Sequence, residues 1–305
     1  MEKKIIILGS EGFIGKSFVN YYKRLDDSNI ELYFIDIVPI KKNNYYNLNA
    51  TNFEKINEII QKIRPDEIYN FSGSFTNIFK TDYENNVIAT KNIIESILLN
   101  NLDDTKILIN GSAAEYGLIQ KEDSIIDEDY PLNPISFYGL SKVFQTYLAK
   151  SYFLMENINV YITRPFNIIG YGVSSKLFIG RLINEIKLNI KEKRRITLGN
   201  LNNERDYIDI EDLINAYVTI IQKGVPGEIY NIGSRCSIKT QNLLKKFMEI
   251  FEIDEKFIEI DKNFIRKFDI PKIIADNTKL KELGWINNIT LGNSIQKIKS
   301  SILSL

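Results

Sequence analysis

The sequence of 305 residues predicts an α/β fold built on a doubly wound parallel sheet, with a smaller C-terminal α/β lobe. Three observations predict it. Short apolar runs rich in β-branched residues alternate with longer segments of helical period through the first half of the chain, as in a parallel sheet covered by helices. Three glycines join the first apolar run to the first helical segment, and beyond about residue 166 the regular alternation stops.

Predicted strands and helices follow one another in order through the first half. We expect strands in the segments KKIIILG, ELYFIDI, EIYNFSG, KILINGS and NVYITRPF. The expected helices lie in FIGKSFVNYYKRL, in FEKINEIIQKI, and near residues 82–100 and 137–155. Six or seven strands of this kind form a doubly wound sheet.

The second half of the chain has a looser pattern. Isolated helices are expected in LFIGRLINEIKLNI, EDLINAYVTIIQK and TQNLLKKFMEIF, between short strands and without a repeat or a low-complexity linker. We therefore predict a first domain over residues 1–166 and a second lobe over residues 167–305. Some strands of this second lobe are expected to return to the main sheet.

Composition excludes several classes of function. Lysine plus arginine and aspartate plus glutamate each number 39, so no net charge favours nucleic acid or an anionic membrane as a partner. Histidine is absent, which removes Ser-His-Asp and Cys-His nucleophile systems and histidine zinc sites, and we expect no metal. General acid/base catalysis then falls to Tyr, Lys, Asp or Glu.

Cysteine content and apolar runs predict a cytoplasmic protein. The single cysteine, Cys236, cannot form an internal disulfide and is expected to be a buried structural thiol. The apolar run IIIL before Gly9 is too short for a signal peptide, and no apolar run is long enough to span a bilayer.

A glycine motif follows the first predicted strand and opens the first predicted helix. Gly9, Gly12 and Gly15 occur in GSEGFIG, where glycine lets the turn close and lets the backbone approach a pyrophosphate at the helix N-terminus. Asp36 ends the second strand about 20 residues further on, at the distance that the dinucleotide-binding fingerprint requires. An ordinary tight turn is the alternative. The context favours an NAD(P)-binding, Rossmann-type domain over residues 1–166.

The same acidic residue bears on the choice of cofactor. The Asp36 carboxylate accepts hydrogen bonds from a ribose diol and repels a 2′-phosphate, so NAD(H) is favoured. Lys41 and Lys42 lie nearby in the sequence and keep NADP(H) open.

Tyr138 and Lys142 form the candidate catalytic pair. They lie four residues apart in YGLSK within a predicted helix, so both side chains face the same way over one turn. An ammonium beside a phenol is expected to lower the phenol pKa from about 10, which lets tyrosine exchange a proton with a substrate alcohol. Ser112, at the end of the strand KILINGS, can hold the same oxygen. An exposed surface pair is the alternative for the Tyr-x-x-x-Lys spacing.

With these elements the chain resembles extended short-chain dehydrogenases/reductases, the NAD-dependent epimerase/dehydratase family acting on nucleotide sugars. The resemblance runs from Lys4 to about Trp285. The segments RPDEIYNFSG, RPFNIIG, LGNLNNERDYIDIEDLINAY and GEIYNIGS resemble the GDP-mannose 4,6-dehydratases and, more closely still, the GDP-4-keto-6-deoxy-D-mannose 4-reductases.

The resemblance implies a cofactor site around the glycine motif and the ends of the next strands. Asn49 takes the place of a family aspartate, and its amide oxygen is expected to accept from the adenine amino group. Pro165 and Phe166 are expected to flank the nicotinamide. Besides the glycines, Asp36, Tyr138 and Lys142, the cofactor residues that the resemblance implies are Phe13, Ile14, Ile37, Asn49, Ala50, Phe71, Ser72, Gly73, Asn86 and Pro165.

The resemblance also implies a nucleotide-sugar site, for which residues 167–305 supply the second lobe. Asn167 is expected to donate to the substrate diphosphate, Arg205 and Arg266 to pair with its charges, and Asp269 to contact the nucleotide ribose. A solvated charged surface is the alternative for the two arginines. The substrate residues implied in full are Ser112, Ala113, Ala114, Asn167, Arg181, Arg205, Arg266 and Asp269.

Ala114 separates this chain from the dehydratases that it resembles. They carry a carboxylate at this position, and an alanine transfers no proton, so we predict that the protein is not a 4,6-dehydratase. Glu115 is the next residue, but one step along a strand reverses the direction of a side chain.

The resulting prediction is hydride transfer between NAD(P)(H) and C4 of a GDP-linked hexose or heptose, most simply reduction of a 4-keto-6-deoxy sugar. A 4-epimerase or 4-dehydrogenase with tightly bound NAD shares these residues and stays open. A non-catalytic nucleotide sensor on the same fold is the alternative from another class. The resemblance also implies a homodimer formed through the helices NVIATKNIIESILL and YGLSKVFQTYLAKSYFL.

Overall fold

The structure is a computed structural model that describes residues 2–25, 27–119, 125–261 and 272–304. Two predicted substrate residues, Arg266 and Asp269, therefore lie outside the described residues. No described helix combines the length and the apolarity that crossing a bilayer requires.

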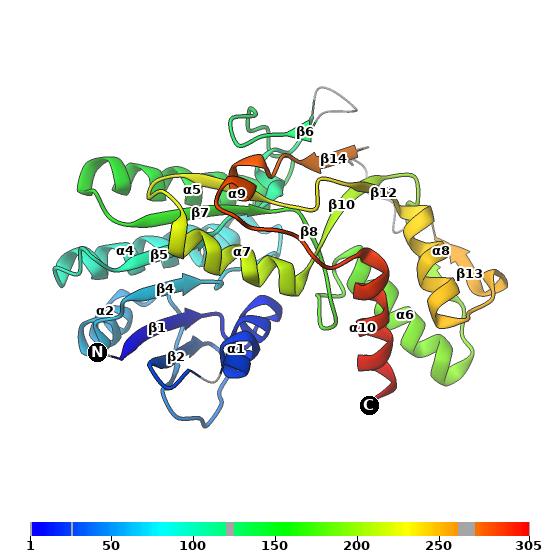
Figure 1. Cartoon of the computed structure of the whole chain (residues 1–305), viewed down its shortest axis with the longest axis horizontal. Helices are drawn as coiled ribbons and strands as arrows, with labels where there is room; N and C mark the ends of the chain where they lie inside the picture. The colour runs from blue at the N-terminus through cyan, green and yellow to red at the C-terminus, as the bar shows by residue number, and fades with distance from the viewer. Residues whose placement is uncertain (1, 26, 120–124, 262–271, 305) are drawn as a thin grey trace.

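A seven-stranded parallel sheet forms the centre of the molecule (Figure 1). Its spatial order is β11 (Ile229–Ile232), β7 (Val160–Pro165), β5 (Lys106–Asn110), β4 (Glu67–Asn70), β1 (Lys3–Leu8), β2 (Ile30–Asp36) and β3 (Tyr45–Asn47). From β1 the chain first builds outward through β2 and β3, then crosses back to β4 and continues through β5 and β7 to β11. The direction in which successive strands are added to the sheet therefore reverses between β1 and β4, although these strands are parallel. The predicted doubly wound α/β fold is confirmed.

Helices cover both faces of the sheet, and the alternation of side chains along each strand explains why. Ile5 and Ile7 of β1 pack in one cluster with α1 (Phe13–Leu25) and α7 (Ile210–Lys223). Ile6 and Leu8 point to the other face, which is covered by α2 (Phe53–Ile63), α4 (Ala89–Leu99) and α5 (Phe137–Glu156). Because both faces are dry, polar side chains with a chemical role are left to the strand ends.

Between the loop after β4 and α4 the helical segment expected near residues 82–100 is composite. It consists of α3 (Phe79–Tyr83), a π-helical turn η1 (Glu84–Ile88) and α4. The π turn is often found at functional sites, and here it carries Asn86.

A second group of elements forms a smaller lobe beyond the sheet, seen in Figure 1 as the cluster of α6, α8 and α10. Its core packs α6 (Phe178–Glu192), α8 (Thr240–Phe251) and α10 (Leu291–Leu303) against β9 (Ile196–Leu198), which pairs with β13 (Ile258–Ile260). A further sheet joins this lobe to the main body. Its strands are β12 (Ser237–Lys239), β10 (Glu204–Asp209), β14 (Lys272–Ala275), β6 (Ile125–Ile126) and β8 (Asn167–Ile169).

Two details refine the sequence-based expectations. The strand β11 and the helix α7 come from the second half of the chain, yet β11 pairs with β7 and α7 covers the main sheet. Cys236 is exposed rather than buried, because it lies in the turn before β12, so the expectation of a buried thiol was wrong.

Replacing Ile6 by alanine tests the packing of the main sheet. Ile6 has no exposed surface. We expect Ile6→Ala to lower the free energy of unfolding by about 2–5 kcal/mol, because the cavity adds to the lost burial. Val225→Ala is the control, since Val225 is 58% exposed and the change is expected to stay within about 0.5 kcal/mol. Urea denaturation measures both, and equal effects would contradict the assigned core.

Candidate active site

Helix α5 places Tyr138 and Lys142 beside the carboxyl end of β5. The helix begins after Ser136, whose side chain accepts a hydrogen bond from Gly139 N. Lys142 is 4% exposed, and its Nζ lies 5.9 Å from the centroid of the Tyr138 ring. The two residues are therefore not an exposed surface pair.

The ammonium of Lys142 is held by two acceptors. Nζ donates to the main-chain oxygen of Asn110 at 2.8 Å and to Oε1 of Gln145 at 2.9 Å. Since an ammonium has three N–H donors, these contacts use two of them. Burial lowers the pKa of Lys142 to about 8, and the nearby Glu115 and Asp82 carboxylates oppose that shift.

The phenol shows a shift opposite to the one predicted. Burial raises the pKa of Tyr138 to about 12, while a hydrogen bond with Ser112 lowers it. A lowered phenol pKa would require the Lys142 ammonium to be a direct partner of the phenol. In the structure the ammonium is bound to Asn110 and Gln145 instead, so burial of the phenol dominates.

Ser112 follows β5 but does not continue it as a strand. It is the N-cap of a short 3₁₀ helix, η2 (Ala113–Glu115), and its Oγ accepts a hydrogen bond from Ala114 N at 3.1 Å. This contact leaves the hydroxyl proton of Ser112 available to donate. Ala113 and Ala114 are both half-buried in this turn.

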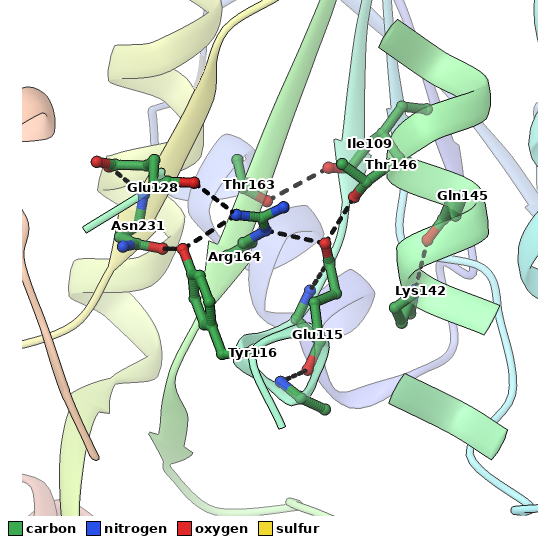
Figure 2. A network of polar contacts seen from close by, with 12 residues as sticks. Ile109, Glu115, Tyr116, Glu128, Lys142, Gln145, Thr146, Thr163, Arg164 and Asn231 are labelled. Atoms are coloured by element: carbon green, nitrogen blue, oxygen red, sulfur yellow. Dashed lines mark hydrogen bonds and ion pairs between the residues drawn. The ribbon is translucent and has the colours of Figure 1, made fainter. Parts of the chain in front are cut away.

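Glu115 has a different environment from the one that strand alternation predicted. The 3₁₀ turn directs it inward, where it has no exposed surface, so the expected strand alternation does not apply at this position. Its carboxylate accepts from Ser112 N, from Thr146 Oγ1 and from Arg164 Nε, each at 2.9 Å (Figure 2). A carboxylate with these partners is a structural acceptor.

The loop after β4 passes close to Lys142. A Cβ built on Gly73 would lie 2.5 Å from Asn86 Oδ1 and 3.8 Å from Lys142 Nζ, so only glycine fits there. Asn86 is fully buried and donates to Ser141 Oγ and to the main-chain oxygen of Ser74. The structure thus brings Gly73 and Asn86 next to the candidate pair.

Phe71 and Ser72 begin this loop. The Phe71 ring lies 5.2 Å from that of Tyr217 in α7, and Ser72 Oγ donates to Asn70 Oδ1. Tyr217 in turn donates to Asn110 Oδ1 at 2.7 Å. Asn110, whose main-chain oxygen accepts from Lys142, is therefore itself held by a side chain of α7.

Phe75 is a site residue that sequence reasoning missed. Its ring meets the Tyr138 ring edge to face at 4.7 Å and is 36% exposed. The buried Asp82 holds this loop by accepting from Ser74 Oγ and from the main-chain N–H groups of Thr76 and Asn77. No local pattern signals the contact between Phe75 and Tyr138, because the two residues lie in segments that are far apart in the sequence.

The glycine motif has the geometry of a phosphate-binding turn. Gly9 has φ +73°, and a Cβ there would lie 2.8 Å from the main chain of Phe71. A Cβ on Gly15 would lie 2.1 Å from Gly9 O. Ser10 Oγ is buried and has no hydrogen-bond partner among the described residues. A polar atom of this kind beside the start of α1, where Phe13 and Ile14 form the first turn, fits a phosphate oxygen.

Asp36 lies at the end of β2 with its carboxylate directed by two N–H groups. Oδ2 accepts from Glu11 N at 2.8 Å, within the glycine motif, and Oδ1 accepts from Val38 N at 3.1 Å. Ile37, between them, is 68% exposed. The carboxylate is thus fixed beside the candidate phosphate turn, as a ribose acceptor requires.

In the region expected to contact adenine, two asparagine side chains already accept hydrogen bonds from main-chain N–H groups. Asn49 Oδ1 accepts from Thr51 N at 3.0 Å, and Asn52 caps α2 by accepting from Lys55 N. An amide oxygen has two lone pairs, so Asn49 keeps one for a ligand. Ala50 is buried, and its oxygen accepts from Asn92.

The remaining predicted residues lie around β7, β10 and α6. Pro165 ends β7, and Phe166 is buried beside Tyr116. Asn167 Nδ2 donates to Asp206 O at 3.1 Å, so one of its donors is already used. Arg205 Nη1 donates to Glu204 O, and Arg181 is half-buried in α6. Asn167 in β8 and Arg205 in β10 belong to the sheet that joins the two lobes, whereas Pro165 ends a strand of the main sheet and Arg181 lies in the smaller lobe.

The fold, together with Ser112, Tyr138 and Lys142 at the carboxyl end of β5, defines a class, the short-chain dehydrogenases/reductases. The family model for GDP-mannose 4,6 dehydratase matches residues 6–298, so the chain belongs to that family of NAD-dependent nucleotide-sugar epimerases, dehydratases and reductases. The family is NAD(P)-dependent. Among the described residues, no group of three or more His, Cys, Asp or Glu is placed to hold a metal ion.

Two curated relatives are similar to the chain in sequence, and a solved structure is similar to it in fold. The chain is 27% identical to GDP-6-deoxy-D-talose 4-dehydrogenase of Aggregatibacter actinomycetemcomitans, over 91% of this chain and 90% of the relative. It is 25% identical to GDP-6-deoxy-D-mannose reductase of Pseudomonas aeruginosa, over 70% of this chain and 71% of the relative. The structure of RMD from Pseudomonas aeruginosa complexed with NADPH superposes with a TM-score of 0.84 at 21% identity, covering 99% of each chain.

Replacing Gly12 by alanine tests the phosphate turn. Among the described residues, a Cβ there would meet only Gly9 O, at 3.2 Å, so a small adjustment accommodates it. We expect Gly12→Ala to fold but to bind NADH at least about ten-fold more weakly, because the methyl group occupies space that the pyrophosphate needs. Gly292→Ala is the control, since its nearest contact is 4.0 Å away. Calorimetric titration with NADH measures both, and equal affinities would remove Gly12 from the site.

Proposed function

We propose that the protein is a nucleotide-sugar 4-reductase that reduces C4 of a GDP-linked 4-keto-6-deoxy hexose, or of a related heptose. The observation that carries the proposal is the group formed by Ser112, Tyr138 and the buried Lys142 at the carboxyl end of β5. Parallel α/β sheets bind ligands at this edge. Similarity to a GDP-6-deoxy-D-mannose reductase supports the GDP-sugar and the direction.

Each residue of this group has a definite role in the proposed reaction. When bound, the reduced nicotinamide supplies the hydride for C4. Tyr138 donates its hydroxyl proton to O4 of the sugar, so that the ketone becomes an alcohol. Ser112 donates a second hydrogen bond to the same oxygen and orients it. The Lys142 ammonium stabilises the phenolate that remains, and its third N–H donor is available to the nicotinamide ribose.

The protonation states are those that the proposed roles of Tyr138 and Lys142 require. Burial raises the pKa of Tyr138 to about 12, so the phenol carries its proton at neutral pH. Reduction needs a proton donor at this position, and oxidation needs a base. Lys142, with its pKa lowered to about 8 by burial, is still mostly protonated at neutral pH and can stabilise the phenolate.

The surroundings of η2 support a reductase without dehydratase activity. Position 114 is alanine, and the neighbouring carboxylate of Glu115 is buried against Arg164. Neither is placed to take a proton from a sugar carbon. We therefore expect no conversion of GDP-mannose to its 4-keto-6-deoxy product by the purified protein.

NAD(H) is the proposed cofactor. The fixed carboxylate of Asp36 accepts from a 2′-hydroxyl and repels a 2′-phosphate. Lys42 lies over the Phe34 ring, with its Nζ 3.3 Å from the ring centroid. The RMD structure contains NADPH, so both cofactors belong in the assay.

A 4-dehydrogenase working in the opposite direction is the second candidate. It is favoured by the similarity to GDP-6-deoxy-D-talose 4-dehydrogenase and needs the same side chains. The absorbance spectrum of the purified protein helps to separate the cycles. Tightly held NAD(H) would favour an epimerase-like cycle or a retained-NAD dehydrogenase, whereas an exchanging reductase purifies without it.

Turnover of a GDP-4-keto-6-deoxy sugar with NADH tests the proposal. We expect oxidation of NADH and formation of the 4-hydroxy sugar, followed by nicotinamide absorbance and product analysis. Tyr138→Phe is expected to lower kcat by at least about 10³-fold, because it removes the proton donor, while NADH still binds. Tyr147→Phe is the control on the same helix, since Tyr147 is 56% exposed. Absence of wild-type turnover with either cofactor would refute the reductase.

A homodimer formed through α4 and α5 is also proposed. Phe137, Phe144, Tyr147 and Leu154 of α5 are exposed, and their spacing places them on one side of the helix. Single exposed apolar residues are common, but an aligned set suggests a covered surface. We expect light scattering to give a dimer, and Phe144→Glu to give a folded monomer. A monomeric wild type would refute the dimer.

A further inference from the structure

A buried ion pair lies directly beside the turn that carries Ser112. Glu115 ends η2 with no exposed surface, and its Oε2 lies 2.9 Å from Nε of Arg164 in β7, which is 2% exposed. Figure 2 shows the pair at the centre of a polar network between β7 and α5. Neither residue is assigned a role in the reaction proposed above.

One oxygen of Glu115 holds the backbone of Ser112. Oε1 accepts from Ser112 N at 2.9 Å, while Ser112 Oγ accepts from Ala114 N, so the two contacts form a capping box. A Cβ on Gly111 would lie 2.5 Å from Glu115 Oε1, so the carboxylate occupies the space that any larger residue there would need. Glu115 therefore holds the backbone of Ser112, while the N–H of Ala114, in the same turn, holds the hydroxyl oxygen.

The other oxygen of Glu115 reaches the helix that carries the catalytic pair. Oε2 accepts from Thr146 Oγ1 at 2.9 Å, and Thr146 lies one turn beyond Lys142 on α5. A single carboxylate thus connects the serine turn, through hydrogen bonds, to the helix of Tyr138.

We infer that Glu115 is a positioning residue for the reaction: its carboxylate, held by Arg164 and Thr146, sets the distance and direction of the Ser112 hydroxyl relative to Tyr138. Glu115 acts through Ser112 and need not touch the substrate or the cofactor. The inference rests on the proposed reductase function. Small displacements of a positioning group lower the rate of the chemical step strongly, because the reacting atoms lose their alignment.

The same network offers a matched control. Arg164 also donates to the main-chain oxygen of Glu128 and to the Tyr116 hydroxyl, which donates to Asn231. The Glu128 carboxylate accepts from Asn231 N and does not contact Ser112. Burial raises the pKa of both Glu115 and Glu128. Glu128→Gln is therefore the same chemical change at the far end of the network.

A double-mutant cycle tests whether Glu115 acts through Ser112. We expect Glu115→Gln to lower kcat on the order of 10- to 100-fold with NADH affinity unchanged, and Glu128→Gln to leave kcat within about two-fold. In a Ser112→Ala background, Glu115→Gln should change kcat by less than about two-fold, because the group that it positions is gone. Effects that multiply in the double variant would overturn the inference, as would an unchanged kcat in Glu115→Gln alone.

A second variant covers the case in which Glu115→Gln fails to fold, since it leaves the Arg164 charge buried without its partner. Thr146→Val keeps the ion pair and the shape of the side chain but removes the bond between Glu115 and α5. We expect a kcat reduced by about 3- to 10-fold, again absent in the Ser112→Ala background. A wild-type kcat in Thr146→Val together with a misfolded Glu115→Gln would mean that the pair serves folding alone.

The pH profile provides a readout that a purely structural role would not move. The charged and titratable groups that act on Tyr138 or Lys142 are Glu115 from η2, Asp82 from α3 and Tyr217 from α7. The Glu115 carboxylate favours the ammonium of Lys142, whose pKa of about 8 is reached before that of Tyr138 as the pH rises, so removal of the carboxylate lowers the pKa of Lys142 further. The decline in reductase rate at high pH should therefore begin at lower pH in Glu115→Gln and not in Glu128→Gln. An identical profile in both variants would contradict the inference.

Hydrogen exchange separates this inference from the proposed function. The Ser112 amide is protected by Glu115, so residues 111–117 should exchange slowly in the wild type, faster in Glu115→Ala, and unchanged in Glu128→Gln. Mass spectrometry measures this without a substrate. An inactive wild type with this exchange pattern would refute the reductase but keep the positioning contact. An active wild type whose exchange ignores Glu115 would refute the contact.

Discussion

The burial of both faces of one parallel sheet constrains the rest of the molecule. Ile5 to Leu8 alternate between two helical layers and leave no face for polar chemistry. Functional side chains therefore gather where strands end. Because the order of strand addition reverses between β1 and β4, the loops that follow these two strands run to opposite sides and leave a crevice between them. Three turns consequently lie side by side at the carboxyl ends of the strands: the glycine turn after β1, the Gly73 loop after β4 and the Ser112 turn after β5.

At that edge the structure maintains a buried cation. Lowering the pKa of Lys142 from 10.5 to about 8 corresponds to about 3 kcal/mol of disfavoured charge. Two acceptors, Asn110 O and Gln145 Oε1, hold the ammonium in place, and Asn110 is itself held by Tyr217. The arrangement weakens the fold locally but keeps the ammonium near the phenol, as expected where function and stability compete.

Local spacing in the sequence predicts the frame of the site well. The glycine turn, Asp36, and the pair of Tyr138 and Lys142 each lie within one strand–turn–helix unit, so periodicity is enough to align them. The helices over residues 13–25, 53–63 and 240–251 have the predicted bounds for the same reason. By contrast, the short strands β3 and β11 depend on their neighbours in the sheet, and apolar pattern does not identify them.

What spacing cannot predict is contact between distant segments. Phe75 meets Tyr138 across 63 positions, and Arg164 meets Glu115 across 49. The direction of the pKa shift at Tyr138 depends on such contacts, because burial is a property of the packed molecule. Sequence spacing correctly placed Lys142 near Tyr138 but could not show that its ammonium is bound elsewhere.

The turn after β5 shows how the backbone decides what a carboxylate does. On a strand, the side chains of Glu115 and Ala114 would point to opposite faces of the sheet. In η2 the side chain of Glu115 turns inward to Arg164, while Ala114 presents only a methyl group. In the proposed reductase, a carboxylate one position further along therefore no longer serves as a proton acceptor. Instead, this carboxylate holds the backbone of Ser112. The segment that lacks the proton acceptor for dehydration therefore positions the serine proposed to act in reduction.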